Sequence, residues 1–129
     1  MRNEEGAGTP AITDAHLKRM LDASIAVVRE VAQREITPRF LRVSHGERKD
    51  DGSLCSEADL AAQQFLVGRL TEILACPIIG EEMSPAMQRA GWHEGSTDEH
   101  GLWCIDPIDG TTSFINGLPC FAISIAWMS

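Results

Sequence analysis

The sequence predicts an α+β fold, because two helical patterns are followed by segments with the period of strands. Residues 14–36 and 57–74 place apolar side chains at helical spacing. Residues 120–129 instead alternate, and one face of that segment carries Phe121, Ile123, Ile125 and Trp127. We therefore expect helices packed against a sheet.

The first helix is expected to follow a short leader. Residues 1–12 are rich in Gly, Glu and Pro and predict a flexible segment, so that the domain occupies residues 13–129. Asp14 is a candidate cap for the helix start. Pro38 is expected to end the helix or to follow its end.

The second helix has the clearest start signal in the chain. Ser56 and Asp59 stand at N-cap and N3 spacing, which is an acidic form of the capping box. The preceding Asp51-Gly52 pair predicts a tight turn. A helix is therefore expected to begin directly after Ser56.

Two short strands are predicted before the last one. "CPIIGEE" reads as a strand that runs into Gly80 and ends at Glu81 and Glu82, and "LWCID" as a second strand. Residues 83–101 between them are polar, show no clear period and predict a long surface loop. One helical turn is expected near Thr111.

Composition limits the partners and the compartment. The net charge of -8 and pI of about 4.8 argue against a nucleic-acid binder. The longest apolar stretch, "CFAISIAWM", is too short to cross a bilayer. The four cysteines have neither zinc nor redox spacing, and the N-terminus lacks signal-peptide features. We expect a cytoplasmic protein with free thiols and no nucleic-acid or membrane partner.

The turn "WCIDPIDGTTSF" carries the most chemistry. Asp106 and Asp109 lie three residues apart, and no Lys or Arg occurs from residue 101 to residue 129. Like charges about 4 Å apart cost about 4 kcal/mol at an effective dielectric near 20. A hard divalent cation would remove that cost, and the Ile108 carbonyl and Glu81 could add oxygen ligands.

The residues after the aspartates suit an anion. Gly110 lets a ligand approach the backbone, and N–H groups at the start of a helical turn near Thr111 favour a phosphate. Asp-Pro and Asp-Gly are also common turn formers, so each feature alone is equally consistent with a plain turn. Their combination at adjacent strand ends favours a site for metal and phosphate.

Three segments resemble the motifs of the inositol monophosphatase family. "WCIDPIDGTTSFINGLP" resembles its W-x-I-D-P-[IL]-D-G-T-x-[NS]-F signature, and "IIGEE" resembles its G-E-E strand end. "DGSLCSEADLAAQ" resembles its S/T-x-x-D helix start, in a form similar to bacterial histidinol-phosphatase-like members. The motifs occur in the family's order, and the resemblance covers about Lys49 to Met128.

The resemblance implies a Mg²⁺-dependent phosphatase that hydrolyses a small phosphate monoester with a metal-activated water. Carried over by position, the metal ligands are Glu81, Asp106, the Ile108 carbonyl and Asp109. Glu81 and Thr111 would orient the attacking water. The phosphorylated metabolite would contact Glu81, Ile108, Asp109, Gly110 and Thr111. Asp59 would lie near a third, weaker metal, and Lys49 in a mobile loop that covers it.

The resemblance also implies a truncated fold. Family members are about twice this length, and their second half supplies a further metal-binding aspartate in a W-D motif that has no match here. The chain would then form the N-terminal half of the layered α/β sugar-phosphatase fold, with two helices packed on a mainly antiparallel sheet and with weak or no activity by itself. A homodimer is left open.

The spacing of the acidic residues argues against two other kinds of site. A haloacid-dehalogenase-type phosphatase uses two aspartates two residues apart, whereas Asp106 and Asp109 are three apart. An EF-hand needs acidic residues at alternate positions and a Glu at the twelfth, which "DPIDGTTSFING" lacks. A non-catalytic half fold, acting as a structural or interaction protein, stays open as the alternative.

Overall fold

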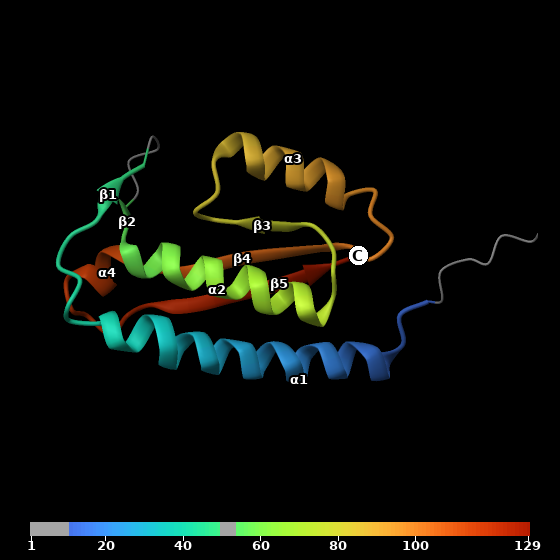
Figure 1. The fold of residues 1–129 in the computed structure, drawn as a ribbon, viewed down its shortest axis with the longest axis horizontal. Coiled ribbons are helices and arrows are strands. Elements are labelled where there is room, and N and C mark those ends of the chain that lie inside the picture. The colour runs from blue at the N-terminus through green and yellow to red at the C-terminus, as the bar shows by residue number, and fades with distance from the viewer. Residues whose placement is uncertain (1–10, 50–53) are drawn as a thin grey trace, which may run out of the picture.

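The computed structural model describes residues 11–49 and 54–129, which form a small α+β fold (Figure 1). The elements, in chain order, are α1 (Asp14–Val31), η1 (Ala32–Ile36), η2 (Thr37–Arg39), β1 (Glu47–Arg48), β2 (Leu54–Cys55), α2 (Glu57–Ile73), β3 (Ile78–Gly80), α3 (Pro85–Gly95), β4 (Leu102–Asp109), α4 (Thr111–Ile115) and β5 (Ala122–Met128). The predicted turn at Asp51-Gly52 and most of the predicted leader, residues 1–10, lie outside the described residues.

The main sheet is mixed and has the order β3–β4–β5. β3 runs parallel to β4, with Gly80 beside Ile105, and β4 runs antiparallel to β5, with Trp103 beside Trp127. The antiparallel pairing is the longer of the two, and its register shifts between Asp106 and Asp109. The shift falls at Pro107, which has no N–H to donate to a ladder. β4 therefore extends beyond the predicted "LWCID" and carries both aspartates.

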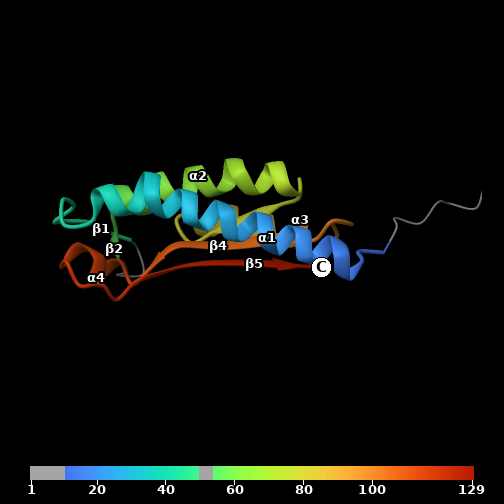
Figure 2. The same ribbon diagram turned by 90° about the horizontal axis from the view of Figure 1, so that it is seen from below.

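Helices α1 and α2 cover one face of this sheet (Figure 2). Leu66 and Leu70 of α2 are fully buried and belong to one core with Trp103 and Ile105 of β4. The Trp103 indole N–H donates a hydrogen bond to the Leu74 carbonyl at 3.1 Å. The predicted arrangement of two helices on a sheet is thus confirmed.

The two helix starts differ in how well they match the sequence predictions. Ser56 and Asp59 form the predicted capping box of α2. The cap of α1 is Thr13, whose hydroxyl accepts a hydrogen bond from the His16 N–H, and Asp14 is the first helical residue. The prediction for Asp14 was therefore wrong by one position, because the Thr13 hydroxyl can also accept a backbone N–H at a helix start.

The predicted loop at residues 83–101 is wrong, because Pro85–Gly95 forms the helix α3. Ser84 caps it by accepting the Met87 N–H, and Pro85 stands at the first helical turn, where it needs no donor. Only Gly95 of this helix is buried, where an added Cβ would lie 2.9 Å from the Leu102 Cβ. With so little of α3 in the core, its sequence shows no apolar period.

Other features of the described chain bear on its environment. The four cysteines are unpaired. Among the described helices, none combines the length and hydropathy needed to cross a membrane. β1 and β2 form a separate two-stranded antiparallel ladder beside the start of α2.

Candidate metal and phosphate site

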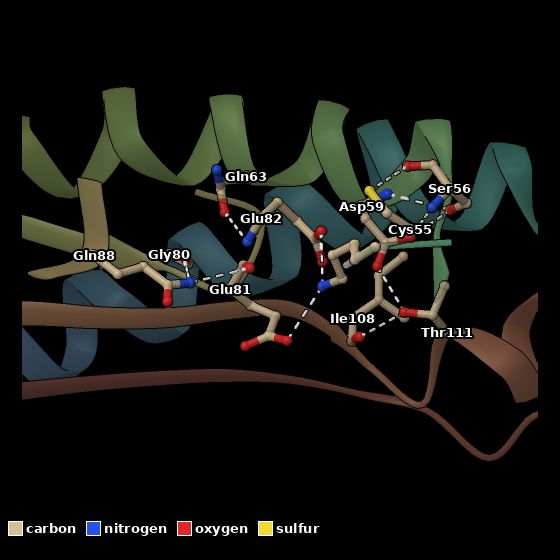
Figure 3. Close-up of polar contacts among 11 residues, drawn as sticks. Cys55, Ser56, Asp59, Gln63, Gly80, Glu81, Glu82, Gln88, Ile108 and Thr111 are labelled. Atoms are coloured by element: carbon tan, nitrogen blue, oxygen red, sulfur yellow. Dashed lines mark hydrogen bonds and ion pairs between the residues drawn. The ribbon is translucent and has the colours of Figure 1, made fainter. Parts of the chain in front are cut away.

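A cleft of about 390 Å³ opens at the end of β4, and most of the predicted site residues line it. Its walls are Arg48, Lys49, Glu81, Glu82, Asp106, Ile108, Asp109, Gly110, Thr111 and Thr112. Because β3 and β4 are parallel, their carboxyl ends meet at one edge. The Glu81 N–H donates to the Ile105 carbonyl at 3.0 Å, which sets Glu81 beside Asp106. Figure 3 shows Glu81, Glu82, Ile108 and Thr111 around this edge.

The turn after β4 is held by one glycine and an aromatic cluster. Gly110 has φ +98°, and an added Cβ would lie 2.7 Å from the Cys120 carbonyl oxygen. It leads into the predicted helical turn, which is α4. Below it, Phe114 is fully buried, and its ring lies 5.6 Å from that of Phe40 and 5.0 Å from that of Phe121. The turn therefore rests on a packed base.

Asp106 has an unsatisfied carboxylate. Its Oδ1 atom is buried and has no hydrogen-bond partner. Burial, followed by the charges of Glu81, Asp109 and Glu82, raises the pKa of Asp106 to about 6. A carboxylate in such surroundings either takes up a proton or needs a cation.

Lys49 supplies one cation to this acidic cleft. Its Nζ lies 3.2 Å from Glu81 Oε1 and 3.1 Å from Glu82 Oε2. Burial lowers the pKa of Lys49, but hydrogen bonds and charges from Glu82 and Glu81 outweigh it and leave the pKa above its usual value. The ammonium offers one positive charge to two glutamates, and it leaves Asp106 Oδ1 without a hydrogen-bond partner.

The cleft fits a hard cation by donor chemistry, although it is not a preformed cage. Within residues 11–49 and 54–129, no three Asp, Glu, His or Cys side chains surround one point. The oxygens at hand come from Glu81, Asp106, Asp109 and the Ile108 carbonyl, and they are the ligand type that Mg²⁺ takes. The unpartnered Asp106 Oδ1 is the observation that favours such an ion.

Asp59 lies behind the cleft and does not line it. Its side chain is fully buried, and its Oδ1 accepts a hydrogen bond from Thr111 Oγ1 at 2.7 Å. Its Oδ2 accepts the Ser56 N–H at 2.8 Å and the Ser56 hydroxyl. With both oxygens engaged, the geometry favours a role in positioning Thr111 over the expected place near a third metal (Figure 3).

Glu82 and Ser56 are buried neighbours of the site that the sequence does not predict as site residues. The Glu82 side chain is 2% exposed, against 47% for Glu81. The Glu82 N–H donates to Gln63 Oε1 at 2.9 Å, and an added Cβ on Gly80 would overlap that amide. The Glu-Glu pair is visible in the sequence, but the contact of the Glu82 backbone with Gln63, nineteen residues earlier, is not. The sequence predicts Ser56 only as a helix cap, whereas in the structure it also holds the carboxylate of Asp59 that contacts Thr111.

We predict that Thr111→Val destabilises the protein by about 1–3 kcal/mol, because the buried Asp59 Oδ1 loses its donor. The free energy of unfolding, from urea titration in EDTA, measures this cost. Thr111→Ser keeps the hydroxyl and should retain most of the stability. Thr112→Val removes an exposed neighbouring hydroxyl and serves as the matched control. Equal stability of Thr111→Val and the wild type would contradict the role of this bond.

We also predict a pH dependence from Asp106. The carboxyl has a pKa of about 6 in the folded chain and 3.8 as its ordinary value. Its contribution to stability is therefore full below pH 3.8 and is lost as the pH rises through 6. In EDTA, Asp106→Asn should be more stable than the wild type at pH 7, by roughly 1 kcal/mol after solvent screening, and should show no such gain at pH 3.5.

Unfolding at both pH values measures that difference. Glu94→Gln, at an exposed acid on α3, is the control for loss of one negative charge. If Asp106→Asn raises the free energy of unfolding equally at both pH values, the gain does not come from removing a buried, ionised carboxylate.

Comparison with known proteins agrees with the motifs. The model of the inositol monophosphatase family matches residues 16–129. The Nus factor SuhB of Pseudomonas aeruginosa is 44% identical over 80 residues, which are 60% of this chain and 27% of that protein. The 3'(2'),5'-bisphosphate nucleotidase CysQ of Haemophilus influenzae is 37% identical over 84 residues, which are 63% of this chain and 29% of that protein.

A solved structure gives the same fold. The IMPase of Thermotoga maritima matches with a TM-score of 0.69 and 31% identity, over 85% of this chain and 39% of that one. This chain thus spans well under half the length of the relatives it matches. From the family model, the fold and the motifs together, the chain belongs to the inositol monophosphatase family.

Proposed function

We propose that the cleft is the front part of a Mg²⁺-dependent phosphatase site for a small phosphate monoester. The observation that supports this most is the buried, unpartnered Asp106 Oδ1 among three other carboxylates. The relatives' names support phosphatase chemistry in general, and they include a nucleotidase. An inositol phosphate or a related metabolite is the proposed substrate.

The proposed metal ligands are Glu81, Asp106, Asp109 and the carbonyl of Ile108. A bound Mg²⁺ would supply a water of lowered pKa and polarise a phosphoryl oxygen. The Glu81 side chain is 47% exposed, so its carboxylate can contact both a bound metal ion and a water. Its pairing with Lys49 involves one oxygen, Oε1. The second oxygen remains available.

Thr111 is proposed to position the attacking water. Its hydroxyl donates to Asp59 Oδ1 at 2.7 Å and also lies 3.2 Å from the Ile108 carbonyl oxygen, so the lone pairs of Oγ1 can accept a hydrogen bond from a water in the cleft. Asp59 in turn accepts the Ser56 N–H, which helps to hold it in place. Thr111 would thereby orient the attacking water.

The phosphate is proposed to sit over the start of α4. Gly110 and Thr111 line the cleft, and the first N–H groups of a helix have no partner within it. The absence of a Cβ on Gly110 lets a phosphate oxygen approach the backbone. Arg48 and Lys49 also line the cleft and add positive charge to it. Cleavage by in-line attack of water needs no covalent phosphoenzyme.

The compartment and the partners of the protein are also proposals. Four unpaired cysteines suit the reducing cytoplasm. We propose no nucleic-acid or membrane partner, consistent with the net charge of -8. A homodimer is open.

The alternative function is a non-catalytic half fold. It is favoured by one observation, that the matched part is 39% of the Thermotoga maritima chain. It predicts that the chain has no specific affinity for divalent cations.

We predict that Mg²⁺ binds to the chain and that Asp106→Asn abolishes this binding in isothermal titration calorimetry. The amide keeps the shape of the side chain but removes the charge that the cation needs. Glu94→Gln, remote from the cleft, should bind like the wild type. Binding that survives in Asp106→Asn would remove the metal assignment. No binding to the wild type would favour the half fold.

We predict only weak turnover of a generic phosphomonoester by the 129-residue chain, well below that of a full-length relative. Asp106 and Asp109 are the only ligands expected here for a second metal. Any turnover should require Mg²⁺ and fall at least a hundredfold in Asp106→Asn. Release of phosphate over time measures it. Turnover in EDTA, or turnover equal to that of a full-length relative, would contradict the proposal.

A further inference from the structure

The proposed metal ligand Glu81 lies in a turn just beyond the end of β3. Glu81 and Glu82 are the two central residues of this turn, which the Met83 N–H closes by donating to the Gly80 carbonyl at 3.1 Å. Turns at the surface are commonly more mobile than the strands they follow. A carboxylate that binds a metal with defined geometry therefore needs support from the surrounding structure.

Helix α2 holds the backbone of this turn through Gln63. The Glu82 N–H donates to Gln63 Oε1 at 2.9 Å. Because an N–H needs an acceptor, the contact fixes the side-chain amide of Gln63 with its oxygen toward the turn. Gly80 leaves room for that amide, since an added Cβ would lie 2.7 Å from the Gln63 Cδ.

Helix α3 holds the carbonyls of the same turn through Gln88. Its Nε2 donates to the Gly80 carbonyl at 3.0 Å and to the Glu81 carbonyl at 3.3 Å. Carbonyl oxygens only accept, so here the nitrogen of the amide faces the turn. Figure 3 shows Gln63 and Gln88 reaching the turn from the two helices. One glutamine is thus an acceptor for the turn and the other is a donor to it.

These contacts leave the backbone of Glu81 bonded at both of its polar groups. Its N–H donates to the Ile105 carbonyl of β4, and its carbonyl accepts from Gln88. Gln63 and Gln88 are both partly buried, whereas Gln64 beside Gln63 is exposed. Neither of the two bonded glutamines lines the cleft. They therefore act on the site through the backbone that carries Glu81.

We propose that Gln63 and Gln88 are positioning residues, which hold the Glu81–Glu82 turn so that the Glu81 carboxylate stays in the cleft for the metal. This inference rests on the proposed function, because it assigns Glu81 to the metal. It also gives α3 a part in the site. The helix has only Gly95 buried, but it brings Gln88 to the two carbonyls.

The test places the same substitution at both positions. Gln63→Glu keeps an oxygen that accepts the Glu82 N–H, whereas Gln88→Glu has no donor for the two carbonyls at neutral pH. Both variants add one negative charge beside the turn, so a charge effect alone would change them alike. Gln64→Glu, at the exposed neighbour, is the control for added charge on α2. Gln63→Met removes the acceptor and keeps a side chain of similar length.

Amide hydrogen exchange in EDTA measures the turn without the metal. The Glu82 amide in Gln63→Met and the Met83 amide in Gln88→Glu should exchange about tenfold faster than in the wild type, as expected for loss of one hydrogen bond. Both amides should stay within about twofold in Gln63→Glu and Gln64→Glu. The amide of Leu70, which is fully buried in α2, should be unchanged in every variant. That separates loosening of the turn from general loss of stability.

Isothermal titration calorimetry with Mg²⁺ measures the effect on the ligand. The Kd should rise about tenfold in Gln63→Met and in Gln88→Glu, and it should not rise in Gln63→Glu. Like effects of Gln63→Glu and Gln88→Glu would overturn the proposal. So would faster exchange at Leu70 to the same degree as at the turn, or a loosened turn with unchanged Mg²⁺ affinity.

Failure of the proposed function gives a different result. If the wild-type chain binds no Mg²⁺, the assignment of Glu81 to a metal is wrong. The exchange rates in EDTA would then still decide whether the two glutamines hold the turn, because that measurement needs no metal.

Discussion

The parallel pairing of β3 with β4 is the constraint on which the site depends. With Gly80 beside Ile105, the next residues on each strand, Glu81 and Asp106, emerge at the same edge of the sheet. Their charges raise the cost of keeping Asp106 ionised, and its pKa rises to about 6. The buried core side chains of β4 fix this register, because a shift by one residue would turn them to the other face of the sheet. The resulting cluster of carboxylates is consistent with a cation as part of the working site.

Behind the acids, the structure is rigid where the proposed chemistry needs rigidity. Asp59 uses both oxygens, one on Thr111 and one on Ser56, and so ties α2 to the turn after β4. The capping box of α2 and the placement of the Thr111 hydroxyl are therefore one network. The same buried acid serves folding and positioning.

The sequence predicts local features of this molecule better than long-range ones. The capping box at Ser56, the strand at Ile78–Gly80 and the helical turn at Thr111 are set by neighbours in the chain, and all three are confirmed. Helix α3 was missed because its burial depends on contact with β3 and leaves no period. The burial of Glu82 and the exposure of Glu81 arise in the folded chain, where the Glu82 N–H bonds to Gln63 of α2. No pattern in the sequence carries that information.

The pairings of β4 on both sides bear on the site as well as on the core. β4 lies between β3 and β5, so the backbone at Asp106 is held from two directions. Ser124 of β5 faces Asp106 in the register, and the ladder then shifts before Asp109. Because Pro107 falls in that shift and cannot donate to a ladder, the two aspartates lie on either side of an irregular step of the strand. The acidic cleft therefore lies where the regular pairing of β4 ends.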